Sequence, residues 1–204
     1  MQSIQIDKKL PRQFYLEDPV KLAPKILGKI IQRKIGNTYF SGKIVEVEAY
    51  RGKDDPAAHS YNGKTKRTEV MFFEGGYLYV YFTYGMHYCA NIVCGNVNEG
   101  AAILIRAVEP LNYIEELSLN RFGKKEITDK GKIILTNGPA KFCKAFNITK
   151  NENGFDLTKE TIFLIEGDKF RKSDIVQTTR IGITKAKDLP WRFYIKNNPY
   201  ISRK

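Results

Sequence analysis

Residues 77–108, YLYVYFTYGMHYCANIVCGNVNEGAAILIRAV, are the most informative segment of the chain for its fold. It holds three runs rich in aromatic and β-branched residues, at 77–83, 87–94 and 101–108. Gly85 interrupts the first pair, and the turn-forming sequence GNVNEG at 95–100 separates the second. Short connections of this kind join antiparallel neighbours, so we expect a three-stranded meander.

A fourth strand is expected upstream, at residues 38–50. Apolar and polar residues alternate in its second half, with the period of two that is typical of a strand. This alternation places three polar side chains on one face: Glu46, Glu48 and Tyr50. The polar segment 53–69 that follows has the composition of an exposed loop.

The remaining elements are short and follow no βαβ rhythm. Asp18 followed by Pro19 predicts a helix at 18–27, and further helices are expected to open at Glu109-Pro110 and near Gly138-Pro139. Residues 162–165 and 192–195 are strand candidates. The mixture of helices and antiparallel strands predicts an α+β protein, with residues 1–204 forming a single domain.

The charge of the chain is strongly basic. Its 204 residues include 34 Lys and Arg against 22 Asp and Glu, a net charge of +12. Residues 171–204 alone carry nine basic and two acidic side chains, among them Arg180, Lys185, Lys187, Arg192 and Lys196. Such an excess favours a polyanion partner, with nucleic acid first among the candidates, although a basic surface can also serve solubility alone.

Several classes of protein are excluded. No apolar run approaches 18 residues and the N-terminus has no signal-peptide pattern, so we expect no membrane segment and a cytoplasmic protein. Cys89, Cys94 and Cys143 have no CxxC spacing, and the set of His87 with Cys89 and Cys94 lacks the glutamate of a zinc deaminase. Neither a P-loop nor GxGxxG is present, and we expect no metal and no cofactor.

Glu48 is the candidate general base. It lies beside Tyr50 near the end of a strand that leads into a polar loop, where partial desolvation would favour a carboxylate that accepts a proton. Glu46 is the natural comparison. The spacing alone does not select Glu48, because both glutamates could also lie on a solvated strand face.

The tyrosines suggest contact with bases. Alternation places Tyr77, Tyr79 and Tyr81 on one face, and leaves Tyr84 and Met86 at the turn around Gly85. Aromatic faces stack on bases, and a side chain at a hairpin tip can wedge between base steps. Ordinary cross-strand packing is the alternative for Tyr77 and Tyr79.

Taken together, these segments resemble the alkyladenine (3-methyladenine) DNA glycosylase family of base-excision repair. The matching segments run in the family's order from about residue 18 to the C-terminus: GKIVEVEAYRG at 42–52, AAHS at 57–60, LYVYFTYGMHYCANI at 78–92, AILIRAVEP at 102–110, NGPAK at 137–141, TRIG at 179–182 and PWRFY at 190–194.

The resemblance implies a role for each matching residue. Glu48 would deprotonate a water held by Arg106 and the backbone carbonyl of Ile181. Four residues would form the base pocket. Tyr50 and Tyr81 would stack on the base, and His59 would contact it through its backbone amide. Asn91 would crowd the amine of guanine. Tyr84, with Met86 beside it, would fill the gap in the duplex.

The resemblance also implies a curved antiparallel sheet surrounded by helices. It implies a monofunctional enzyme, in which water and not a lysine is the nucleophile. The expected partner is double-stranded DNA containing damaged purines, bound by a monomer. Two alternatives stay open, a non-catalytic basic nucleic-acid-binding module and an RNA-directed enzyme, as does the choice among 3-methyladenine, 7-methylguanine, hypoxanthine and ethenoadenine.

Overall fold

The structure is a computed structural model that describes residues 9–83 and 85–203. Within these residues the strands are β1 (Ile30–Ile35), β2 (Thr38–Arg51), β3 (Leu78–Thr83), β4 (His87–Cys94), β5 (Ala101–Pro110), β6 (Ile162–Ile165), β7 (Ile175–Thr178) and β8 (Arg192–Ile195). The α-helices are α1 (Pro19–Ile26), α2 (Ile114–Phe122), α3 (Asp129–Ile134) and α4 (Pro139–Ala145).

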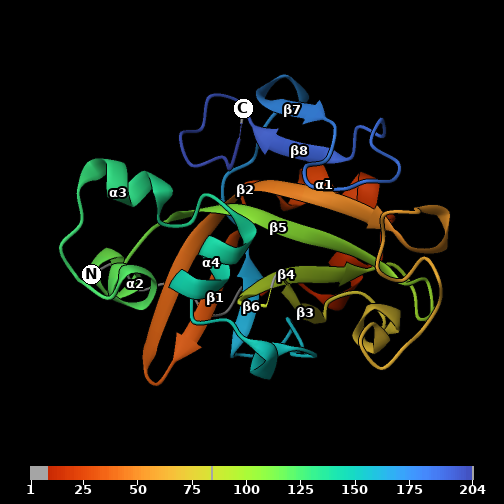
Figure 1. Ribbon diagram of the computed structural model, residues 1–204, viewed down its shortest axis with the longest axis horizontal. Coiled ribbons are helices and arrows are strands. Elements are labelled where there is room, and N and C mark those ends of the chain that lie inside the picture. Colours follow the sequence, from red (N-terminus) through yellow and green to blue (C-terminus); the bar gives the residue numbers. More distant parts are fainter. Residues whose placement is uncertain (1–8, 84, 204) are drawn as a thin grey trace.

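The strands form one curled antiparallel sheet of eight strands (Figure 1). Its main path runs β3-β4-β5-β2-β1-β6, and the β7–β8 hairpin attaches to β2. The long strand β2 is the centre of the fold, because it pairs with β1, β5 and β8 at different points along its length. The expected α+β class and curved antiparallel sheet are confirmed.

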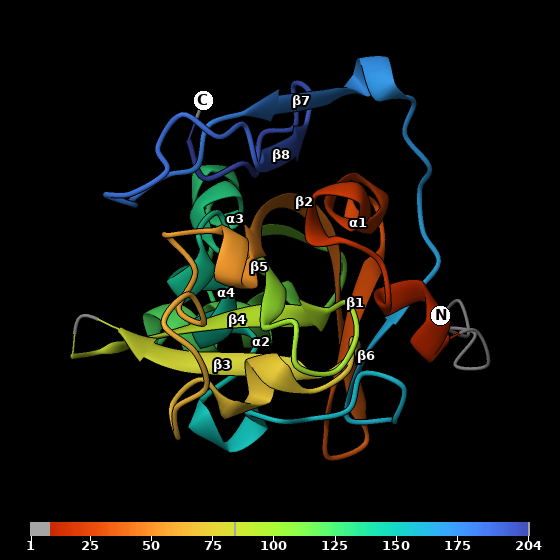
Figure 2. The same cartoon turned by 90° about the vertical axis from the view of Figure 1, so that its right-hand side faces the viewer.

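The alternation of each central strand divides its side chains between two environments. Apolar residues of β2 to β5, such as Val47, Ile92 and Ile103, join the main core, which also includes residues of α1 and α4. Figure 2 shows α1 beside β2 and the β3–β4 hairpin projecting from the body of the sheet. The intervening residues of the same strands therefore face away from this core and are available for a site.

The helix expected to open at Glu109-Pro110 is placed wrongly. Pro110 ends β5, where it pairs with Gly42, and α2 begins only at Ile114. Tyr113 precedes the helix in a left-handed conformation, with φ of 48°. A proline is tolerated at the end of a strand as well as at the start of a helix, so its position alone did not fix the boundary.

The other expected elements are confirmed. Asp18 caps α1 by accepting a hydrogen bond from the backbone N–H of Val20 at 3.0 Å, and α4 begins at Pro139. The meander of β3, β4 and β5 is present. Strands β1 and β7 and helix α3 are additional to the elements expected from the sequence. In the part of the chain that the structure describes, no helix has the length and apolarity to cross a bilayer.

Candidate active site

Strand register brings two of the candidate residues, Asn91 and Glu48, into one row across the sheet. Successive cross-strand pairs connect five neighbouring strands, and the row consists of Tyr79, Asn91, Leu104, Glu48 and Arg192. Paired residues in a sheet lie about 5 Å apart, so residues distant in sequence become neighbours. The row places Glu48 between the aromatic side of the sheet and the β7–β8 hairpin.

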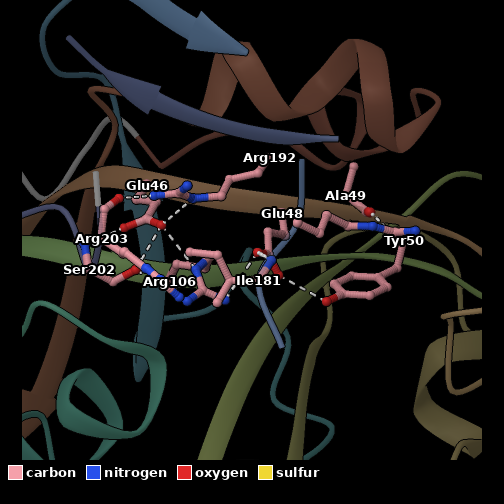
Figure 3. A network of polar contacts seen from close by, with 10 residues as sticks. Glu46, Glu48, Ala49, Tyr50, Arg106, Ile181, Arg192, Ser202 and Arg203 are labelled. Atoms are coloured by element: carbon pink, nitrogen blue, oxygen red, sulfur yellow. Dashed lines mark hydrogen bonds and ion pairs between the residues drawn. The ribbon is translucent and has the colours of Figure 1, made fainter. Parts of the chain in front are cut away.

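Glu48 is fully buried and surrounded by donors (Figure 3). Its Oε1 accepts a hydrogen bond from the backbone N–H of Ile181 at 2.7 Å and lies 3.1 Å from Nη1 of Arg106. Its Oε2 accepts a hydrogen bond from the Tyr50 hydroxyl at 2.9 Å. Glu48 therefore does not lie on a solvated strand face, the alternative that the sequence left open. An ion pair and two hydrogen bonds compensate for the burial of its carboxylate.

A cavity of about 330 Å³ opens beside this carboxylate. The cavity is lined by the three residues that hold Glu48, namely Tyr50, Arg106 and Ile181. It is also lined by His59, Tyr81 and Asn91, which the resemblance assigned to a base pocket. Further lining residues are Ala57, Met71, Tyr79, Thr83, Cys89, Leu104, Pro139, Gly182 and Ile183. The volume is at the small end for ligand pockets and leaves room for a single base.

The aromatic wall of the cavity is ordered by ring contacts. The rings of Tyr79 and Tyr81 are stacked, with centroids 5.7 Å apart, and His59 meets Tyr81 edge to face at 4.5 Å. Nδ1 of His59 also lies 3.1 Å from the Tyr79 hydroxyl. Asn91 donates a hydrogen bond to the Tyr79 carbonyl at 3.1 Å. The wall is therefore held in place without a ligand.

Burial sets the charge of these side chains. It raises the pKa of Tyr50, and the neighbouring Glu48 carboxylate raises it further, so Tyr50 stays a protonated donor. Burial likewise raises the pKa of Tyr81. Burial lowers the pKa of His59 below 6.5, and the positive charge of Arg67 lowers it further. Both effects favour the neutral form of the His59 imidazole.

Glu46 is also fully buried, which the sequence did not indicate. Its Oε1 accepts hydrogen bonds from Nε of Arg106 at 3.0 Å, from Nε of Arg192 at 2.7 Å and from the Ser202 hydroxyl at 2.8 Å. Burial disfavours the charge of Arg106, but Glu48 and Glu46 outweigh this effect and hold its pKa above its usual value. Glu46 therefore belongs to the same charged network as Glu48 and cannot serve as an independent comparison for it.

Asp55 and Arg180 form a second buried pair that sequence reasoning missed. Two guanidinium nitrogens of Arg180 donate to the Asp55 carboxylate at 2.5 and 2.9 Å. The same guanidinium lies over the rings of Tyr50 at 4.7 Å and Trp191 at 5.1 Å. The pair thus fixes both Tyr50 and the backbone that offers the Ile181 N–H. No local signal links residues 125 positions apart in the sequence.

The basic C-terminal segment is divided by the fold. Arg180 and Arg192 are buried in the pairs described above, so they are not part of a phosphate-binding surface. Lys185, Lys187 and Lys196 are exposed. Lys185 and Lys187 lie two and four residues after Ile183, the last residue of this segment that lines the cavity.

The short connection between β3 and β4 includes Met86, whose side chain is 70% exposed. Tyr84, the expected wedge, lies outside the described residues.

Comparison with known proteins agrees with this geometry. The sequence profile of the methylpurine-DNA glycosylase family matches residues 13–199. Relatives named "Putative 3-methyladenine DNA glycosylase" occur in Clostridium botulinum, 49% identical over 96% of this chain and 99% of the relative, and in Francisella tularensis, 48% identical over 91% and 94%.

The fold holds an aromatic cavity beside a buried carboxylate, and the sequence matches the profile of a DNA glycosylase family. The protein is therefore a DNA glycosylase. The chain belongs to the methylpurine-DNA glycosylase family. The resemblance in the sequence is confirmed.

The environment of His59 yields a first prediction. A ¹⁵N NMR titration should give His59 a pKa below 6.5, because burial and Arg67 both disfavour its protonated form. The substitution Arg67→Ala should move this pKa upward only in part, since burial is the larger cause. The chain has two histidines, so a His87→Gln variant assigns the signals. A His59 pKa at or above 6.5 in the wild type would contradict the described pocket.

Proposed function

We propose that this enzyme is a monofunctional glycosylase that acts on alkylated or deaminated purines in duplex DNA. It flips the damaged nucleotide into the cavity and hydrolyses its N-glycosidic bond, leaving an abasic site. The observation that carries the proposal is Glu48, a buried carboxylate whose three polar partners all line one base-sized aromatic cavity.

The position of the reactive groups supports flipping. The carboxylate is buried behind the cavity wall, out of reach of a base that is stacked in a duplex. Unstacking and unpairing a damaged base costs less free energy than doing so for a normal base, which favours entry of the damaged base into the cavity. Tyr84 and Met86 at the hairpin tip would occupy the gap that the flipped nucleotide leaves.

Glu48 has the remaining capacity that a general base needs. An ionised carboxylate offers about four lone-pair sites, and three donors occupy three of them. The free site would accept a proton from a water whose oxygen forms a bond to C1′ of the sugar as the bond from C1′ to the purine nitrogen breaks. The electron pair of that bond leaves with the base.

The same carboxylate stabilises the transition state electrostatically. Cleavage of the glycosidic bond develops positive charge on the sugar, and a preorganised negative group nearby lowers the energy of this state. Arg106 and the Ile181 N–H hold Glu48 in place, and the Ile181 carbonyl would orient the water. The proton ends on Glu48 and no covalent enzyme intermediate is required.

The cavity also suits the charge of its substrates. A purine alkylated at N3 or N7 is cationic, and aromatic ring faces attract cations. Tyr50 and Tyr81 supply such faces, while neutral His59 adds no repulsion. Asn91, fixed by its bond to the Tyr79 carbonyl, would crowd the exocyclic amine of normal guanine.

The decisive test is Glu48→Gln, which keeps the shape of the side chain and removes its charge and basicity. We expect the single-turnover rate of base release from an oligonucleotide with one alkylated purine to fall by about 10² to 10⁴-fold, the usual worth of a general base. Binding of the same duplex should change little. Glu115→Gln, an exposed glutamate on α2, is the matched control.

A Glu48→Gln enzyme that retains a near-normal rate would reject the proposed mechanism. Binding of the damaged duplex without base release by the wild type would instead identify a non-catalytic nucleic-acid-binding module.

A separate prediction concerns the exposed lysines Lys185 and Lys187. Each neutralised phosphate contributes about −0.9 to the slope of log K against log salt. Lys185→Gln with Lys187→Gln should therefore make the slope for undamaged duplex shallower by up to about 1.8, without changing which base is excised. The matched control is Lys124→Gln with Lys125→Gln, an equal loss of charge between α2 and α3. Equal slopes for the two double variants would place the DNA elsewhere.

A further inference from the structure

We propose that Ser202, in the C-terminal tail, is a positioning residue for catalysis that acts with Glu46 through Arg106 on Glu48. The inference rests on the proposed role of Glu48 as the general base. It assigns a role in the reaction to a segment that follows the last strand of the sheet and lines no part of the cavity.

The Arg106 guanidinium has three nitrogens, and each is committed to a different partner. Nη1 faces the catalytic carboxylate of Glu48 at 3.1 Å. Nε donates to Glu46 at 3.0 Å, and Nη2 donates to the Ser202 hydroxyl at 3.2 Å. A planar guanidinium held at two of its nitrogens cannot rotate about its axis, so Glu46 and Ser202 determine where Nη1 points.

Ser202 also closes a cycle of hydrogen bonds (Figure 3). Its hydroxyl accepts from Arg106 and donates to Oε1 of Glu46 at 2.8 Å. Its backbone N–H donates to Oε2 of the same carboxylate at 2.5 Å. The serine therefore binds both members of the ion pair at once, which a merely space-filling residue would not do.

The tail is anchored at points on either side of Ser202. The side chain of Ile201 is buried, and Nη2 of Arg192 donates to the Arg203 carbonyl. Arg192 at the same time pairs with Glu46. The docking of the tail and the orientation of Arg106 thus both depend on the buried carboxylate of Glu46.

Charge balance explains why a neutral residue holds this place. Glu46 and Glu48 carry two negative charges, and Arg106 and Arg192 carry two positive charges, all buried together. A fifth charged side chain would leave one charge without compensation in this buried site. A hydroxyl supplies one donor and one acceptor and leaves this balance unchanged.

The substitution Ser202→Ala removes only the hydroxyl. We expect the single-turnover rate constant to fall about tenfold, as for the loss of hydrogen bonds to charged groups, with damaged-duplex affinity unchanged. Ser202→Thr keeps the hydroxyl and should restore most of the rate. Ser173→Ala, at an exposed serine that bonds to Asp174, is the matched control and should have no effect.

Two readouts separate positioning from a structural role. A destabilised fold lowers the fraction of active enzyme, seen as the amplitude of base release, whereas lost positioning lowers the rate constant at full amplitude. In an Arg106→Lys background, which has already lost the forked contacts, Ser202→Ala should lower the rate no further.

An unchanged rate constant in Ser202→Ala, a loss of amplitude alone, or additive effects with Arg106→Lys would each overturn the inference. These outcomes differ from a failure of the proposed function, which would appear as a near-normal rate in Glu48→Gln.

Discussion

The structure depends on keeping two carboxylates of one strand, Glu46 and Glu48, ionised in the interior. Removing such groups from water is costly unless they are paired and hydrogen-bonded. Arg106 from β5 lies between them and contacts both. The central pairing of β2 with β5, the docking of β8 and the path of the C-terminal tail all bring donors to these two side chains.

This constraint links the fold to the reaction. A carboxylate in water reorients freely, whereas Glu48 is held by Tyr50, Arg106 and the Ile181 N–H before any substrate arrives. Preorganised charge of this kind needs no reorganisation as the transition state forms. The aromatic wall, fixed by contacts among Tyr79, Tyr81 and His59, provides the matching rigid surface for the base.

Much of this arrangement could be predicted from the sequence, because strands encode their faces locally. Alternation correctly placed Glu46, Glu48 and Tyr50 on one side of β2, and the β3–β4–β5 meander followed from its turns. What alternation does not encode is what covers a face. Both glutamates are buried because β8 pairs beside them and the 179–183 segment and the tail bond to their carboxylates, and no periodicity predicts these contacts.

The contacts that the sequence did not predict were missed for the same reason. Arg180 with Asp55, and Glu46 with Ser202, join positions 125 and 156 residues apart through irregular segments. The basic C-terminal excess indicated a surface for DNA, yet two of its arginines serve these interior pairs instead. Net charge indicates a polyanion partner but not which side chains reach it.

The role of Glu48 can be examined in a crystal structure of the enzyme with duplex DNA carrying a damaged purine on a 2′-fluoro sugar, which resists cleavage. We expect the purine to be flipped between Tyr50 and Tyr81, and a water within about 2.6 to 3.2 Å of Glu48 to face C1′. A purine that remains stacked in the duplex, or one bound with its C1′ directed away from Glu48, would rule out Glu48 as the general base.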